Sequence, residues 1–276
     1  MPQTLAEWIK TCPLPKLEAR MLLQHATGYT RAQLITREHE ALEENVQTAL
    51  NALACRRIQG EPMAYILGNR EFYGRMFKVN PHVLIPRPET EHLVEAVIRY
   101  LPRSGKVWDL GTGSGIIAVT IALERADAQV FASDISAAAL QIAADNARAL
   151  GAEVEFSCGS WFEAGRPSEN HTFDIIVSNP PYIEAEDSHL QQGDLRFEPQ
   201  SALTDFSDGL SCIRVLAEGA QTYLKEGGRL MVEHGYNQGR AVRELFKQNG
   251  FREIETLQDL AGQDRITLGT IGLEAV

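Results

Sequence analysis

From residue 86 onward, short apolar stretches alternate with stretches of helical spacing, and no other feature limits the fold of this chain as strongly. Strands that are separated by helices pair in one direction, so the alternation predicts an α/β protein with helices on both faces of a parallel sheet. Ligands bind such sheets outside the carboxyl ends of the strands. Seven strands are predicted, over 106–110, 129–134, 153–158, 173–179, 229–234, 251–259 and 265–272, of which the last two form an antiparallel pair.

Residues 1–70 have a different character, because they contain helical patterns and no alternating strand pattern. We therefore expect a small all-helical N-terminal domain over 1–70, a hairpin or linker over 71–85 and the α/β domain over 86–276. The N-terminal segment has eight Lys and Arg against seven Glu, whereas the whole chain has a net charge of −11. The first domain is thus close to neutral, and Arg56 and Arg57, which follow one of its helices, are expected to be exposed.

Charge and cysteine content limit the possible partners and compartments. An excess of acidic residues disfavours passive binding to nucleic acid, which needs clustered Lys and Arg. The four cysteines are scattered without paired spacing, and the histidines show no ligand spacing, so no metal site is expected. The sequence has no secretory pattern and no apolar run near the ~20 residues that span a bilayer. These features predict a cytoplasmic protein without membrane contact, and we expect a monomer.

A glycine-rich turn, "DLGTGSG", follows the first strand of the predicted sheet. Glycines at 111, 113 and 115 let the backbone approach a ligand closely. The spacing differs from the G-x-G-x-x-G of dinucleotide sites, because Ile116 stands where the third glycine is needed, and no G-K-[ST] follows. Asp134 ends the second strand, where a carboxylate can accept hydrogen bonds from both hydroxyls of a ribose. Together these features indicate a nucleoside cofactor without a pyrophosphate.

Trp161 follows the third strand and is expected near the same ligand. Its ring can pack on an adenine face, or it can be a core tryptophan of the sheet; the sequence leaves both roles open.

The fourth strand ends at "NPPY", residues 179–182. The oxygen of the Asn179 side chain and the carbonyl of Pro180 can each accept one N–H of a substrate –NH₂, which aims the nitrogen lone pair at a methyl donor. Two prolines make the turn rigid, and Tyr182 offers a flat face to a planar amide or base. The motif resembles that of amino-methyltransferases, and this resemblance implies methyl transfer to a planar amino group, on adenine N6, cytosine N4 or the side-chain amide of a glutamine.

Six segments together sharpen this prediction: "LEARMLLQHATG", "GEPMAYILGNREFYG", "LIPRPETE", "DLGTGSG", "VSNPPYI" and "DLRFEPQSAL". The sequence that contains them resembles the HemK/PrmC family of peptide-chain release factor glutamine methyltransferases. The resemblance implies a class I (Rossmann-like) seven-stranded methyltransferase sheet. It also implies S-adenosyl-L-methionine as cofactor, S-adenosyl-L-homocysteine as product, and as acceptor the glutamine (N5) of a Gly-Gly-Gln loop on class I release factors.

The resemblance also implies site residues. The expected cofactor contacts are Gly111, Thr112, Gly113, Ser114, Gly115, Asp134, Trp161 and Asn179. The expected acceptor contacts are Asn179, Pro180, Pro181 and Tyr182, of which Asn179, Pro180 and Tyr182 are the predicted catalytic residues.

Several alternatives stay open at this stage. The acceptor can instead be a ribosomal-protein glutamine, or adenine N6 of a nucleic acid, although the latter requires a basic face that residues 1–70 lack. Arg87 can contact a ligand or tie the linker to the α/β domain. The helical domain can recognise a folded protein acceptor or serve only as a scaffold.

Overall fold

The computed structural model describes residues 3–165 and 172–272, and the predicted fold class is confirmed. The helical part contains α1 (Leu5–Thr11), α2 (Lys16–Thr27), α3 (Arg31–Thr36), α4 (Glu44–Ile58) and α5 (Met63–Leu67), and a hairpin of β1 (Asn69–Phe72) and β2 (Arg75–Lys78) follows. The remaining strands are β3 (Lys106–Leu110), β4 (Gln129–Asp134), β5 (Glu155–Cys158), β6 (Phe173–Ser178), β7 (Leu224–Glu233), β8 (Phe251–Gln258) and β9 (Asp264–Ile271). The helices that accompany them are α6 (Thr90–Tyr100), α7 (Ile116–Glu124), α8 (Ala137–Leu150), α9 (Gln200–Leu203), α10 (Ser211–Tyr223) and α11 (Gly239–Gln248), with short 3₁₀ turns η1 (Trp161–Ala164), η3 (Ser188–Gln191) and η4 (Leu195–Phe197).

The large sheet has seven strands in the order β5-β4-β3-β6-β7-β9-β8. All neighbours are parallel except β9, which is antiparallel to both β7 and β8, as predicted for the last two strands. The chain moves from β3 toward one edge of the sheet and later from β6 toward the other. The carboxyl ends of β3 and β6 therefore flank the switch point at which ligands bind in open α/β sheets.

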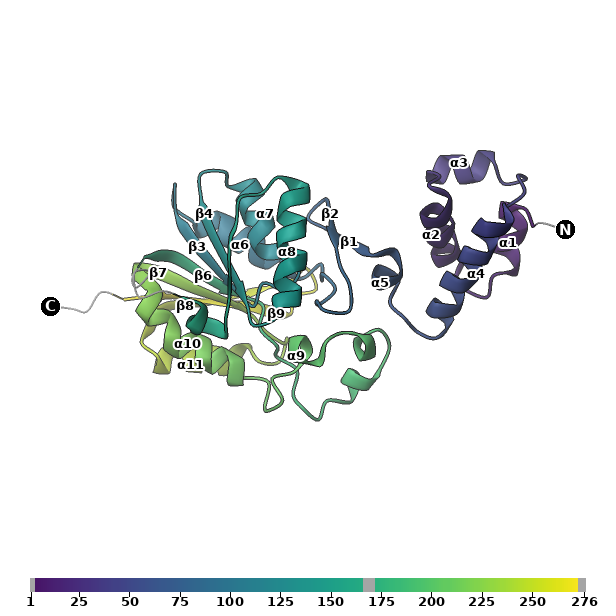
Figure 1. Cartoon of the computed structure of the whole chain (residues 1–276). Coiled ribbons are helices and arrows are strands. Elements are labelled where there is room, and N and C mark those ends of the chain that lie inside the picture. Colours follow the sequence, from purple (N-terminus) through teal and green to yellow (C-terminus); the bar gives the residue numbers. More distant parts are fainter. Residues whose placement is uncertain (1–2, 166–171, 273–276) are drawn as a thin grey trace.

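Helices cover both faces of this sheet because its strands are apolar on both sides (Figure 1). Helices α6, α7 and α8 pack with Val107, Ile175 and Met231 on one face, and α10 and α11 pack with Ile176 and Leu230 on the other. Strand β7 begins five residues before the predicted start at 229, because Leu224 already pairs with the start of β6 across an irregularity in the register.

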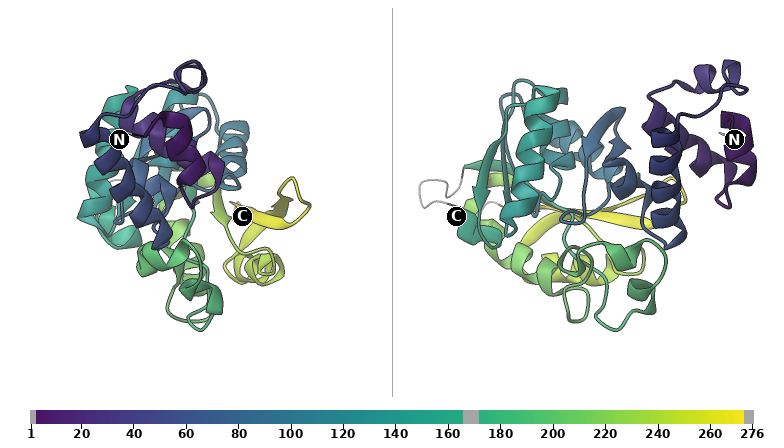
Figure 2. Two further views of the ribbon diagram at one scale, coloured as in Figure 1. Left: turned by 90° about the vertical axis from the view of Figure 1, so that its right-hand side faces the viewer. Right: turned by 45° about the vertical axis from the view of Figure 1, so that its right-hand side comes forward.

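The helices α1–α4 form a separate cluster at one end of the molecule (Figures 1 and 2). They enclose an apolar core of their own, which includes Leu5, Trp8, Leu22, Leu23 and Leu50. Trp8 is 3% exposed, and its indole N–H donates to Asn51 of α4 at 2.9 Å. None of the helices in the described part of the chain combines the length and apolarity needed to cross a bilayer.

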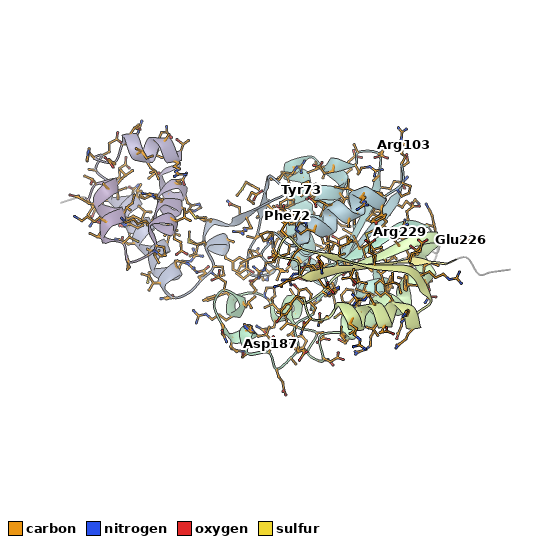
Figure 3. The ribbon with its side chains drawn as sticks, turned by 180° about the vertical axis from the view of Figure 1, so that it is seen from behind. Phe72, Tyr73, Arg103, Asp187, Glu226 and Arg229 are labelled. Carbon is orange, nitrogen blue, oxygen red and sulfur yellow. The ribbon has the colours of Figure 1, made fainter. Side chains whose placement is uncertain are left out.

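The hairpin that follows belongs to the core of the sheet domain. Phe72, which is labelled in Figure 3, and Phe77 are almost fully buried, meet edge to face at 6.1 Å and join the cluster on the α6–α7 face. Asn146 of α8 holds the hairpin in place, since its side chain bonds both the N–H and the carbonyl of Lys78. Strand β1 begins at Asn69, so strand structure starts two residues before the predicted boundary at 71.

The long connection between β6 and α10 is folded into short turns and extends outward from the sheet domain, with Asp187 near its outer edge (Figure 3). We refer to residues 183–208 as the outer segment. It reaches the helical domain, because Arg196 donates to the carbonyl of Gln59 at 2.9 Å and Asp194 accepts from Arg57. The outer segment thus connects the two parts of the chain at a second place besides the covalent linker.

Candidate active site

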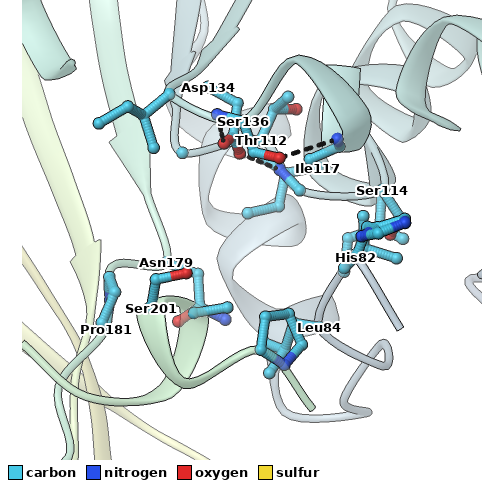
Figure 4. Close-up of a pocket in the computed structure, with 18 of the residues that line it drawn as sticks. His82, Leu84, Thr112, Ser114, Ile117, Asp134, Ser136, Asn179, Pro181 and Ser201 are labelled. Atoms are coloured by element: carbon cyan, nitrogen blue, oxygen red, sulfur yellow. Dashed lines mark hydrogen bonds between the residues drawn. The ribbon is translucent and has the colours of Figure 1, made fainter. Parts of the chain in front are cut away.

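A cavity of about 370 Å³ opens at the carboxyl ends of β3, β4 and β6, at the switch point of the sheet (Figure 4). Its lining residues come from the glycine turn after β3, the end of β4, the turn before η1, the start of NPPY, the linker and the outer segment. They are Pro81–Leu84, Gly111–Ser114, Ile116, Ile117, Asp134–Ser136, Ala139, Gly159–Trp161, Asn179, Pro181, Pro199, Ser201 and Ala202.

The glycine turn places backbone against this cavity. Gly113 has a φ of 57°, and a Cβ at this position would meet nothing within 4 Å, so the requirement for glycine is conformational. Gly115 serves a different purpose. A Cβ at Gly115 would lie 3.0 Å from the Cβ of Ala143, so this glycine allows α7 to pack closely on α8, and it does not line the cavity.

Asp134 is held rigidly at the end of β4. Its Oδ2 accepts the N–H of Gly113 at 2.9 Å and its Oδ1 accepts the N–H of Ser136 at 2.8 Å. Burial raises the pKa of this carboxyl, and the backbone N–H groups partly oppose that effect. A carboxylate has about four acceptor sites, so each oxygen can still accept a hydroxyl from a ligand.

Trp161 lines the cavity and also packs against the core cluster on the α10 face. Its φ of 45° lies in the left-handed region, which is unusual for a bulky residue and is found mainly where surrounding structure enforces it. Its ring passes 3.7 Å from the position that a Cβ on Gly111 would take. Trp161 therefore lies between the cavity and the core, and its packing on an adenine face stays a prediction.

Asn179 lines the same cavity (Figure 4). Strand β6 is fixed beside β3 by Ser178, whose hydroxyl donates to the carbonyl of Leu110 at 2.7 Å. The Nδ2 of Asn179 donates to the hydroxyl of Thr90, the first residue of α6, at 3.1 Å. The amide oxygen is the end of the side chain that is left for a ligand.

The side chain of Tyr182 does not line the cavity. Of the residues that follow Asn179 in the motif, Pro181 lines it, whereas Pro180 and Tyr182 do not. The hydroxyl of Tyr182 points to Oε1 of Glu233 at 3.4 Å, and its carbonyl accepts from Gln238 at 2.9 Å. Burial, with the nearby Glu233 carboxyl, raises the pKa of the phenol.

The linker and the outer segment form a wall that sequence reasoning did not predict. Linker residues 81–84 and residues 199–202 line the cavity together. Glu198, 3% exposed, holds them side by side, since its carboxylate accepts the N–H of Ile85 at 2.9 Å and pairs with Arg87. Arg87 therefore ties the linker to the outer segment and does not line the cavity. The signal in the sequence was the pair of segments "LIPRPETE" and "DLRFEPQSAL", whose contact becomes visible only in three dimensions.

The charges around the cavity are negative or absent. No Lys or Arg is found among the described residues that line it, and Asp134 is its one carboxylate. Behind the glycine turn, Asp109 is fully buried, and burial raises its pKa to about 7. Its Oδ2 accepts from Thr112 and Ala118, whereas Oδ1 has no hydrogen-bond partner in the described structure. A pyrophosphate would find no compensating cation here.

Two family models match the chain: the PrmC N-terminal domain over residues 6–68 and the methyltransferase small domain over residues 89–196. A release factor glutamine methyltransferase of Neisseria gonorrhoeae is 64% identical over 266 residues, which are 96% of this chain and 97% of that protein. The chain belongs to the family of release factor glutamine methyltransferases. The protein of that name from Bordetella pertussis is 50% identical, over 93% of this chain and 95% of its own length. The predicted HemK/PrmC relationship is thereby confirmed.

Solved structures support the fold at much lower identity. A methyltransferase from Pyrococcus furiosus is 16% identical and superposes with a TM-score of 0.56 over 84% of this chain and all of that one. An rRNA methyltransferase from Thermus thermophilus, solved with AdoMet and guanosine, has a TM-score of 0.52 at 20% identity and covers 73% of this chain and 49% of its own. These likenesses establish the fold of the sheet domain and nothing about its substrate.

Proposed function

We propose that this methyltransferase transfers a methyl group from S-adenosyl-L-methionine to the side-chain amide nitrogen (N5) of the glutamine in the Gly-Gly-Gln loop of class I peptide-chain release factors. The observation that carries this proposal is that Asp134, Asn179 and the glycine turn line one and the same cavity. A ribose ligand and an amide ligand can therefore be held in contact. The reaction is expected in the cytoplasm, where release factors act.

The cavity fits the proposed cofactor by charge and by shape. S-adenosyl-L-methionine carries a sulfonium and no phosphate, which agrees with a lining that includes one carboxylate and no Lys or Arg among its described residues. We infer that Asp134 accepts the ribose hydroxyls, that the turn from Gly111 to Ser114 provides the backbone wall for the methionine part, and that Trp161 contacts the adenine. The cofactor supplies an electrophilic methyl group; the acceptor must be made nucleophilic by the protein.

The acceptor amide is a poor nucleophile, because its lone pair is delocalised into the carbonyl. We propose that the Asn179 side-chain oxygen and the Pro180 carbonyl each accept one N–H of the glutamine –NH₂. Both hydrogens are then held, and the nitrogen lone pair is directed into the cavity. Orientation of this kind supplies much of the acceleration in reactions between two bound substrates. The methylated nitrogen is strongly acidic and loses its proton to water.

We propose the expected domain roles for the chain as a whole. Residues 1–70 would recognise the folded release factor, residues 71–85 would link the domains, and residues 86–276 would bind cofactor and acceptor glutamine. We also propose that the enzyme is a monomer.

The test is a methylation assay with radiolabelled S-adenosyl-L-methionine and purified class I release factor. We expect one methyl group on the tryptic peptide that contains Gly-Gly-Gln, and none when the acceptor glutamine is replaced by alanine. A matched pair of reactions would offer ribosomal protein and nucleic acid to the same enzyme. Label in ribosomal protein or in adenine, with none in release factor, would overturn the proposal in favour of the corresponding alternative.

A further inference from the structure

Two aromatic side chains are exposed on the surface of the sheet domain. Phe206 is 66% exposed and Tyr236 is 63% exposed, and no other Phe, Tyr or Trp in the described part of the chain reaches this exposure. One exposed apolar side chain is ordinary on a protein surface, so what matters is where these two lie.

Both residues lie beside a junction that includes the proposed acceptor turn. The side-chain N–H groups of Gln238 donate to the carbonyl of Tyr182 at 2.9 Å and to the carbonyl of Gly209 at 3.2 Å. Tyr236 is two residues before Gln238, and Phe206 is three residues before Gly209. A Cβ on Gly209 would lie only 2.6 Å from the carbonyl oxygen of Tyr182, so the segments are in close contact. Phe206 and Tyr236 are therefore carried by segments that are fixed directly to the end of the NPPY turn.

The chain that leaves the acceptor turn also pairs with the loop that carries Phe206. The N–H of Ile183 donates to the carbonyl of Leu203, and the N–H of Ala185 donates to the carbonyl of Ser207, both at 3.0 Å. A glutamine held at the NPPY turn belongs to a protein much larger than the cavity. That protein must also meet the surface beside the turn, and this loop is part of that surface.

Phe206 is held in an unfavourable backbone conformation. Its φ of 56° lies in the left-handed region, where a bulky residue is an outlier. The carboxylate of Asp205 enforces the loop, because it accepts three backbone N–H groups between Ser207 and Ser211 and the hydroxyl of Ser211. The N–H of Phe206 donates to the hydroxyl oxygen of Thr204 at 3.0 Å. Strained residues of this kind are concentrated at binding and catalytic sites, and here burial of the ring does not offset the strain.

Tyr236 is held by a tight corner after β7. The N–H of Gly235 donates to the side-chain oxygen of Gln238 at 2.8 Å, and the guanidinium of Arg265 lies 5.9 Å from the centre of the Tyr236 ring. This second ring is thus also placed by its neighbours without being buried by them.

The surroundings of the two rings are acidic. Residues 183–208 contain seven Asp and Glu against one Arg and no Lys. Glu184 and Glu186, which follow the acceptor turn, are both exposed. A partner that complements this surface presents an apolar side chain surrounded by basic ones.

We propose that Phe206 and Tyr236 form an aromatic docking surface for the class I release factor, on which the face around the Gly-Gly-Gln loop packs while its glutamine occupies the acceptor site. The inference rests on the proposed function, because it names how that same acceptor protein is held. The aromatic docking surface contributes to binding of the intact protein and takes no part in the chemical step.

The first experiment uses Phe206→Asn, because asparagine tolerates the left-handed conformation and lacks the ring. Calorimetry with S-adenosyl-L-homocysteine present should show that the dissociation constant of intact release factor rises about tenfold, as for other aromatic interface anchors. At saturating release factor, kcat should stay within about twofold of wild type, since uniform binding is lost. The dissociation constant of S-adenosyl-L-methionine should be unchanged. Phe206→Tyr keeps the ring and should bind release factor as wild type does.

The melting temperature separates docking from a structural role for the ring. Phe206→Asn relieves the backbone strain and removes no buried side chain, so it should melt no lower than wild type. A lower melting temperature together with unchanged affinity for release factor would show that the ring only stabilises its loop, and would overturn the inference.

Tyr236→Ala should raise the dissociation constant of release factor by a similar factor. Met76→Ala is the matched control, because Met76 is 54% exposed on β2, next to Arg75. Arg75 pairs with Glu124, the last residue of α7, at the end of that helix remote from the glycine turn. Affinity should be unchanged in the control. Equal losses in all three variants would mean that any exposed apolar side chain has this effect, which contradicts a specific surface.

Sedimentation velocity tests whether a second copy of the chain covers this surface instead. We expect wild type and Phe206→Asn to sediment alike. A wild-type dimer that Phe206→Asn converts to a monomer would assign the surface to self-association and overturn the inference.

The outcomes also separate the two proposals. If wild-type enzyme does not methylate release factor, the proposed function fails, and the docking role fails with it. If wild type methylates release factor while Phe206→Asn and Tyr236→Ala bind it with unchanged affinity, the proposed function stands and the docking role is wrong.

Discussion

The guanidinium of Arg57 lies 3.1 Å from Oδ1 of Asp194, so an ion pair joins the end of α4 to the outer segment. Arg57 also makes two 3.0 Å hydrogen bonds to Glu18 of α2. Its side chain is only 21% exposed, so the expectation that Arg57 is exposed was wrong. Arg56 is likewise paired, with Glu61. These arginines help to hold the helical domain together and to place it against the outer segment.

We expect Arg57→Ala to lower the free energy of unfolding by about 1–3 kcal/mol, because Glu18 loses a bidentate charged partner in a partly buried place. Urea unfolding followed by circular dichroism measures the change. Arg31 is exposed, and Arg31→Ala serves as the control with an expected change within about 0.5 kcal/mol. Equal stability of wild type and Arg57→Ala would show that the ion pairs contribute nothing.

Asp134→Ala should weaken cofactor binding without abolishing turnover, since the ribose lies away from the transferred methyl group. Loss of a charged hydrogen-bond partner costs ~1.5–3 kcal/mol, or roughly ten- to a hundredfold in the dissociation constant. Asp134 also holds the N–H groups of Gly113 and Ser136, so Asp134→Asn, which keeps an acceptor, should lose less affinity. Titration calorimetry with S-adenosyl-L-methionine is the measurement, and an unchanged constant in the alanine variant rules out the ribose contact.

Asn179→Ala should reduce kcat far more than the affinity for either substrate, because the directed lone pair matters in the transition state. Asn179→Asp should also be impaired. It keeps an acceptor but places a charge beside a desolvated amide, and it loses the N–H that Thr90 accepts. Steady-state kinetics with intact release factor test both variants, and near-normal kcat in either one is incompatible with the orientation mechanism.

Recognition by the helical domain can be tested with its exposed cations. Arg20 and Arg31 are exposed, and the double change to Glu should slow association with release factor in a salt-dependent manner. Arg103→Glu is a matched control on the sheet domain, since Arg103 is exposed and lies at the end remote from the helical domain (Figure 3). Cofactor affinity and melting temperature should stay the same in all variants. If kcat/KM for intact release factor does not change in the double variant, or in a wider scan of exposed residues in 1–70, the scaffold role applies.

Asp109 should make the protein less stable as pH rises. Its pKa is about 7 in the folded state, above the ordinary value of an unfolded aspartate near 4, so the folded state holds more protons between these values. Stability contributed by this group is therefore lost as pH increases from about 4 to 7, by up to ~1.4 kcal/mol per pH unit. Asp109→Asn cannot titrate but can still accept from Thr112 and Ala118. Urea unfolding at pH 5.5 and 7.5 should show a smaller loss for Asp109→Asn than for wild type; equal losses would contradict the assignment.

Much of this protein could be predicted from local sequence. The alternation of apolar strands and helices specified the α/β fold, because each element must bury its own apolar face. The glycine turn, Asp134 and NPPY lie at strand ends, and parallel strands bring their carboxyl ends to one edge, so their meeting at a cavity followed from strand direction alone. Single motifs also predicted the type of interaction they make. The amide of Asn179 indicated a hydrogen-bond acceptor, and the prolines at 180 and 181 indicated a rigid turn.

Other features were decided only by the tertiary structure. The pairing of β6 with β7, together with α6 packing across the ends of both strands, brings together Thr90, Asn179 and Glu233. These three residues are 54–143 positions apart in the chain. The same holds for Glu198 with Ile85 and for Arg57 with Asp194. A hydrogen bond or ion pair of this kind depends on where two distant backbones are placed to within an ångström. That placement is set by the order of the strands and the packing of the whole core, and no local pattern of residues predicts it.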